Sequence, residues 1–225
     1  SDFAGSTLVH ACGGSAALAG VIVLGAREGR FSKAGQKLSM IPFAASSIPL
    51  VTLGTFLLWF GWFGVNAIAK IAVNTHLAGA AGTVTGALLT RLIAGKTDII
   101  MMLNGALAGL VAITAEPLTP SPILAMVIGS IGAMIMYFGT KMLESFGIDD
   151  VVGAIPVHMF AGIFGTLVVP ISNDGTSFGT QFVGTISVCV FSFVLSYLVF
   201  SALKATVGLR ISKAAEKLGT DKSEV

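Results

Sequence analysis

Long apolar stretches separated by short polar segments run along the whole of this chain. A helix needs about 20 apolar residues to cross the hydrocarbon core of a bilayer, and seven stretches approach or exceed that length. They cover residues 4–26, 39–65, 71–94, 98–115, 121–143, 151–171 and 180–207. The pattern predicts an all-α integral membrane protein with about seven transmembrane helices.

Composition supports this class and argues against others. The 225 residues are 54% hydrophobic and only 11% charged, whereas about 25% of the residues in a soluble domain are charged. The basic residues are dispersed between apolar runs, which does not indicate a nucleic-acid partner. Cys12 and Cys189 lie inside apolar runs without the spacing of a metal site or a disulfide framework. No nucleophile–base set, phosphate loop or dinucleotide fingerprint is visible, so we expect no enzyme, cofactor or metal.

Charged residues in the short loops predict the orientation of the chain. Basic residues mark cytoplasmic loops, and nearly all of them fall in alternate loops: Arg27, Arg30, Lys33 and Lys37, then Arg91 and Lys96, then Lys141, then Lys204, Arg210, Lys213, Lys217 and Lys222. The opposite loops contain Lys70, Glu116 and Asp174. We therefore expect the N-terminus of this chain outside, a transmembrane domain over residues 1–207, and a cytoplasmic tail over residues 208–225.

Two segments repeat the pattern Asp-x-x-Gly-x-x-x-Val-His-x-x-x-Gly. They comprise Asp2, Gly5, Val9, His10 and Gly14, and then Asp150, Gly153, Val157, His158 and Gly162. Each opens an apolar helix, which the aspartate caps at its positive end. An ionisable side chain inside a membrane is costly and usually marks a site. Because the two helices run in opposite directions, an in-plane two-fold axis would bring His10 and His158 into contact near the midplane.

The first repeat, Asp2-Phe-Ala-Gly-Ser-Thr-Leu-Val-His10, resembles the DFAGGxVVH signature of the ammonium transporter family (Amt/Mep/Rh). Four more stretches agree in order: Phe60–Gly64 with Asn66, Leu103–Thr114, Asp149–Asp150 with Val157–His158, and Val207–Arg210. The resemblance implies part of an eleven-helix fold with inverted five-helix repeats. The chain is similar to its helices five to eleven and tail, and lacks the first four helices.

The same resemblance implies transport of ammonium or ammonia across the cell membrane, by a homotrimer with one pore in each protomer. His10 and His158 would then form a twin-histidine site in the pore, since an imidazole offers one proton donor and one acceptor. Asp2 and Asp150 would have a structural role near the pore.

Four further residues are candidates for the pore or its outer vestibule, namely Trp59, Trp62, Phe63 and Thr114. Aromatic faces attract cations, although an aromatic belt at the membrane interface is the alternative for the three rings. The family also implies contact with membrane lipid and a PII-type regulatory protein at the cytoplasmic face. Two other functions stay open: an ammonium sensor module coupled to a signalling domain, and a fragment that does not transport.

Overall fold

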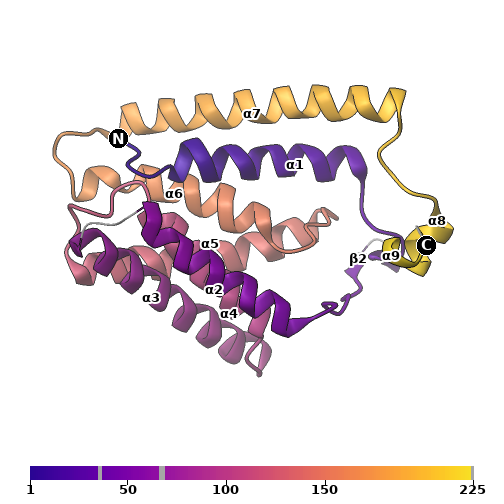
Figure 1. Ribbon diagram of the computed structural model, residues 1–225, viewed down its shortest axis with the longest axis horizontal. Coiled ribbons are helices and arrows are strands. Elements are labelled where there is room, and N and C mark those ends of the chain that lie inside the picture. The colour runs from indigo at the N-terminus through magenta and orange to yellow at the C-terminus, as the bar shows by residue number, and fades with distance from the viewer. Residues whose placement is uncertain (35–36, 66–68, 224–225) are drawn as a thin grey trace.

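The computed structural model describes residues 1–34, 37–65 and 69–223, and its elements form a helical bundle (Figure 1). In chain order they are η1 (Ser6–Ala11), α1 (Cys12–Leu24), β1 (Phe31–Ala34), β2 (Lys37–Met40), α2 (Ile48–Val65), α3 (Ala69–Ala94), α4 (Ile99–Ile113), α5 (Pro122–Ser145), η2 (Ile155–Phe160), α6 (Ala161–Leu167), η3 (Val169–Ile171), α7 (Phe178–Thr206), α8 (Lys213–Leu218) and α9 (Thr220–Ser223). Asn66, part of one family-like stretch, lies outside the described residues.

The apolar helices correspond to the seven predicted spans. Within the described residues, four are long and apolar enough to cross a membrane: Ser6–Leu24, Ala69–Ala94, Pro122–Ser145 and Phe178–Thr206. Three shorter apolar helices cover Ile48–Gly64, Ile99–Ile113 and Ile155–Ile171. The prediction of an all-α membrane fold is confirmed.

The start of the second span was predicted wrongly. Residues 39–47 were expected to be helical, but β2 pairs antiparallel with β1, with Phe31 opposite Met40. Arg30 extends this arrangement by donating from Nη1 to the Ile41 carbonyl at 2.7 Å. Pro49 then occupies the first turn of α2, a position where proline does not disturb the helix.

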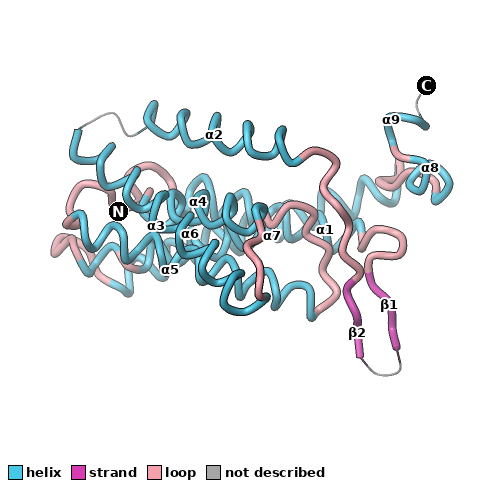
Figure 2. Tube along the Cα trace, turned by 90° about the horizontal axis from the view of Figure 1, so that it is seen from below, coloured by secondary structure: helices cyan, strands magenta, loops and turns pink. Residues whose placement is uncertain are grey.

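Small residues allow α3, α4 and α5 to pack with their backbones in contact. A Cβ added at Gly82 would lie 2.2 Å from the Gly105 carbonyl oxygen, and one at Gly129 would lie 2.2 Å from the Ala78 oxygen. Such stripes let helices approach closely in lipid. Elsewhere α1 lies along α7, while α2 stands on the outer side of the bundle and packs on α4 (Figure 2).

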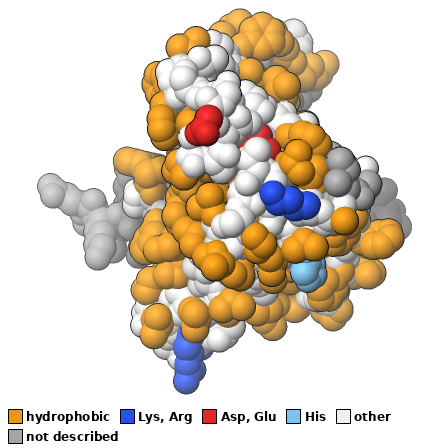
Figure 3. Space-filling view, turned by 90° about the vertical axis from the view of Figure 1, so that its left-hand side faces the viewer, with side chains coloured by type: hydrophobic (Ala, Val, Ile, Leu, Met, Phe, Trp, Pro, Cys, Tyr) orange, Lys and Arg blue, Asp and Glu red, His pale blue; other side chains and the backbone are white. Residues whose placement is uncertain are grey.

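The two ends of the bundle differ in their charged groups. At one end Asn173 Nδ2 donates to Glu116 Oε2 at 2.8 Å, and few charged side chains interrupt the hydrophobic ones on this face (Figure 3). At the other end Lys213 Nζ lies 3.4 Å from Glu28 Oε2, and Glu216 accepts from the Glu28 backbone N–H at 2.8 Å. Thus the tail folds back on the loop after α1. The loops that the sequence assigned to opposite sides of the membrane thus lie at opposite ends of the bundle. Which end faces the cytoplasm stays a prediction.

Candidate functional site

The two repeated segments adopt the same local structure, which the sequence does not reveal. Both histidines lie in a π-helical turn, η1 for His10 and η2 for His158, that continues into an α-helix. Turns of this kind are rare and are often found at functional sites. A turn with a left-handed glycine precedes each of them, at Gly5 with φ 101° and at Gly153 with φ 76°.

The repeated aspartates make the capping contacts predicted for them. Asp2 Oδ2 accepts from the backbone N–H groups of Thr7 and Leu8 at 3.1 and 2.9 Å. The carboxylate of Asp150 accepts from three consecutive N–H groups, the shortest bond being 2.7 Å to Ile155. The residues at the cap positions themselves are Gly5 and Ala154, so the aspartates reach the helix ends from outside the cap. They satisfy donors that would otherwise be unpaired.

The repeated glycines allow the two histidine-bearing helices to cross. A Cβ at Gly14 would lie 2.5 Å from the Met159 backbone nitrogen, and one at Gly162 would lie 2.4 Å from the Ser6 carbonyl oxygen. In both cases the obstructing atom is backbone of the other repeat. Neither position has room for a side chain.

The crossing brings His10 and His158 together, as predicted. Their Nδ1 atoms are 3.2 Å apart, and the rings are stacked with centroids 5.2 Å apart and planes 13° from parallel. A neutral imidazole carries one N–H and one acceptor nitrogen. Two neutral rings can therefore share this hydrogen bond only when one is protonated on Nδ1 and the other on Nε2.

Trp62 also stacks on His10. Its ring centroid is 5.0 Å from that of His10, with the planes 9° apart. The indole Nε1 donates to Thr114 Oγ1 at 2.8 Å, and Thr114 in turn donates to the Leu110 carbonyl. Trp62 and Thr114 are buried, which places them inside the bundle beside the histidines and excludes Trp62 from an interfacial belt.

The other two aromatic candidates lie elsewhere. Trp59 and Phe63 gather around His76, with ring centroids 5.4 and 6.3 Å from it. The His76 side chain is exposed. The structure thus separates the predicted vestibule residues into a pair beside His10 and a pair around His76.

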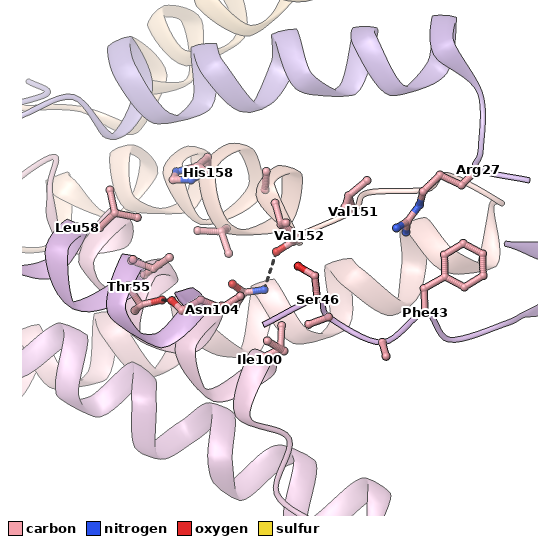
Figure 4. Close-up of a pocket in the computed structure, with 18 of the residues that line it drawn as sticks. Arg27, Phe43, Ser46, Thr55, Leu58, Ile100, Asn104, Val151, Val152 and His158 are labelled. Carbon is pink, nitrogen blue, oxygen red and sulfur yellow. Dashed lines mark hydrogen bonds between the residues drawn. The ribbon is translucent and has the colours of Figure 1, made fainter. Parts of the chain in front are cut away.

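His158 borders a cavity of about 630 Å³. The cavity extends from His158 past Leu58 and Val152 to Arg27 and Phe43 (Figure 4). Most polar groups of its wall are hydrogen-bonded within the protein. For example, Asn104 Nδ2 donates to the Val152 carbonyl at 2.9 Å. The wall is otherwise largely aliphatic, and this suits a small neutral solute better than a bare ion.

An ion-paired cluster lies at the far end of this cavity. Arg27 donates to both carboxylate oxygens of Asp149, from Nε at 2.7 Å and from Nη2 at 2.8 Å, and Arg30 Nε lies 3.2 Å from the same group. Burial alone would raise the pKa of Asp149, but the hydrogen bonds and charge of Arg27, helped by Arg30, hold that pKa below its ordinary value. The cluster therefore remains ionised at neutral pH.

Residues 1–225 match the sequence model of the Ammonium Transporter Family. The chain belongs to this family. Its members are transporters rather than enzymes. The described residues contain no group of three His, Cys, Asp or Glu side chains that could hold a metal ion.

Two ammonium transporters illustrate the similarity in sequence. Ammonium transporter Amt2 of Archaeoglobus fulgidus is 40% identical over an alignment covering 99% of this chain and 53% of that protein. Putative ammonium transporter sll0537 of Synechocystis is 39% identical, with 99% of this chain and 44% of that protein covered. The chain spans about half the length of the curated relatives it matches.

Solved structures agree with the family. A structure titled Sensor Amt Protein has a TM-score of 0.93 and 34% identity, covering all of this chain and 60% of that one. Candida albicans Mep2 has a TM-score of 0.83 and 27% identity, covering all of this chain and 55% of that one.

Apart from His158, sequence reasoning did not identify the residues that line the cavity. Asn104 lies in one of the family-like stretches, but its contact with Val152 depends on how α4 meets the loop before η2. Thr55 lies in an apolar span, and the sequence around it contains no motif that would mark it as a cavity residue. In the structure its hydroxyl donates to the Val51 carbonyl one turn earlier. Asn104 is a polar residue inside an apolar span, and this feature of the sequence could have indicated that it lines the cavity.

Proposed function

We propose that this chain forms the histidine-bearing part of a membrane pore that carries ammonium as ammonia plus a separately handled proton. The observation that carries the proposal is the 3.2 Å contact between His10 Nδ1 and His158 Nδ1 inside an apolar bundle. Transfer of a bare cation into such surroundings costs many kcal/mol. A neutral ammonia molecule avoids that cost, provided that a nearby group accepts and returns the proton.

Paired imidazoles suit this task. Each offers a proton donor and an acceptor, and imidazole changes charge near neutral pH more readily than other side chains. Because the two rings share a hydrogen bond, a proton taken up by one changes the acceptor capacity of the other, and they titrate as a coupled pair. In this proposal Trp62 fixes His10 on one side, while the cavity beside His158 provides a way out.

The remaining features of the proposal come from the family. We propose a cell-membrane protein with its C-terminal tail in the cytoplasm, a homotrimeric assembly, and a PII-type regulatory partner on the cytoplasmic face. Support for the tail as a regulatory element lies in its contacts with the loop after α1, where Lys213 and Glu216 meet Glu28.

Transport assays on histidine variants test the function. In proteoliposomes containing the full-length protein, replacing both His10 and His158 by leucine should abolish selective ammonium currents, measured against potassium. His76→Leu is the matched control, since that imidazole is exposed and lies in a separate aromatic group. An unchanged current and selectivity in the double variant would show that the pair is structural only.

A second candidate function is ammonium sensing, and one observation favours it. The structure titled Sensor Amt Protein has a TM-score of 0.93 with this chain. A sensor would bind ammonium saturably without sustained flux, so calorimetric binding combined with no proteoliposome current in the unmodified protein would favour sensing over transport.

A further inference from the structure

Three threonine hydroxyls meet beside the crossing of the two repeats. Thr7 of η1 lies 2.6 Å from Thr166 of α6, measured between Oγ1 atoms, and 3.2 Å from Thr185 of α7. We call these residues the threonine cluster. A hydroxyl has one proton to donate and two lone pairs that accept, so Thr7 donates to at most one neighbour and accepts from at least one. The cluster therefore links three separate helical segments through a single side chain.

The cluster is fully inside the bundle. Thr7 and Thr166 are each 4% exposed and Thr185 is 1% exposed. A buried hydroxyl without a partner loses its hydrogen bonds to water and gains nothing in return. Gln181 extends the network by donating from Nε2 to the Thr166 carbonyl at 2.9 Å. The hydroxyls are therefore held in a connected set of contacts.

The buried part of α7 lies between Gln181 and Ser192 and is largely polar. Its buried residues are Gln181, Thr185, Cys189 and Ser192, and Ser192 donates to the Cys12 carbonyl at 2.8 Å. Packing and hydrogen bonds between helices replace the hydrophobic driving force inside a membrane. Hence polar contacts help to attach α7 to η1 and α1.

The position of Thr7 connects the cluster to the histidines. Thr7 and His10 occupy the same six-residue π-helical turn, and Thr166 lies on the helix that continues from the turn bearing His158. The repeated glycines set how closely the two helices approach, but close contact alone does not fix their rotation. A second point of attachment at Thr7 and Thr166 does so.

We propose that the threonine cluster is a positioning device that holds the turn bearing His10 at the rotation where its Nδ1 meets Nδ1 of His158. Its predicted effect on transport rests on the proposed function, whereas its effect on the geometry of the pair does not. Thr7, which bonds to both neighbours, is its central member.

Isosteric variants separate this role from general packing. Thr7→Val, Thr166→Val and Thr185→Val remove a hydroxyl at nearly constant volume, and Thr7→Ser retains it. Thr83→Val is the matched control, because among the described residues the Thr83 hydroxyl bonds only to the Gly79 carbonyl of its own helix. The full-length protein in lipid bilayers is labelled with ¹⁵N-histidine, and solid-state NMR records the correlation between Nδ1 of His10 and Nδ1 of His158. Ammonium and potassium currents are measured on the same variants.

We expect Thr7→Val to weaken or abolish the Nδ1–Nδ1 correlation, with Thr7→Ser restoring it and Thr83→Val leaving it unchanged. A hydrogen bond between membrane helices shifts an equilibrium by about threefold on average, so ammonium-over-potassium discrimination should fall by about threefold or more in Thr7→Val. Loss of the correlation in a protein that carries no ammonium current even when unmodified would support the positioning role and refute the transport proposal. An intact correlation in both Thr7→Val and Thr166→Val would overturn the positioning role.

Discussion

Adding one methyl group at the crossing of the repeats should separate the histidine pair. In Gly162→Ala the new Cβ would lie 2.4 Å from the Ser6 carbonyl oxygen and 3.1 Å from the Ala11 nitrogen. Both are backbone atoms of the opposite repeat, so no side-chain rotation relieves the contact. The helices themselves must move apart.

The size of the movement follows from ordinary contact distances. Carbon and oxygen atoms in contact lie at least about 3.4 Å apart, so the crossing must open by about 1 Å. Ser6 and His10 share the turn η1, and the ring of His10 moves with it. An Nδ1–Nδ1 distance that starts at 3.2 Å then becomes about 4 Å, beyond hydrogen-bonding range. Overpacking of this kind also costs about 1–3 kcal/mol of stability.

Gly13→Ala is the matched control. It adds the same methyl group one residue before Gly14, at a position where, beyond the adjacent backbone of its own helix, no atom of the described residues would lie within 4 Å of the new Cβ. The assay combines the thermal unfolding midpoint in detergent with ammonium and potassium currents in proteoliposomes of the full-length protein. Gly162→Ala should lower both the midpoint and the selectivity for ammonium, while Gly13→Ala should change neither. If Gly162→Ala retains full selectivity and the Nδ1–Nδ1 correlation by NMR, the close backbone contact does not set the spacing of the histidines.

Two other substitutions test the surroundings of the pair. Thr114→Val removes the acceptor of the buried Trp62 Nε1–H and should cost about 1–3 kcal/mol, read as a lower unfolding midpoint; an unchanged midpoint would mean that water replaces the hydroxyl. Asp149→Asn weakens the bidentate contact with Arg27 and should cost a similar amount at neutral pH. Because folding lowers the pKa of Asp149 below 3.8, its carboxylate stabilises the protein above that pH and loses this effect as the pH falls through the folded pKa. The difference between wild type and Asp149→Asn should therefore shrink in acid, and a difference independent of pH would contradict the assignment.

Apolar length and the internal repeat were sufficient to predict the class of fold and the central contact. Each predicted span corresponds to an apolar helix, and the equal spacing of Asp2–His10 and Asp150–His158 correctly predicted that the two rings meet. These features depend on local sequence and on symmetry. Because both repeated segments fold in the same way, equivalent residues of the two segments, such as His10 and His158, meet where the segments cross.

Features that depend on tertiary contacts outside the repeat were not predictable. Ser39 and Met40 were assigned to the start of a span because apolar residues follow them, yet they pair with β1. The polar face of α7 was counted as part of an apolar span, because its sequence does not show which side α1 covers. Trp62 was assigned with its neighbour Trp59, although the fold buries one beside His10 and directs the other toward His76.

The repeat also explains where the site loses its symmetry. His10 and His158 have matching turns, caps and crossing glycines, but their outer faces differ: Trp62 stacks on His10, while His158 borders the cavity that leads to Arg27. The hydrogen bond between the two rings therefore has different surroundings at its two ends: an indole lies against the His10 ring, and the cavity lies beside the His158 ring.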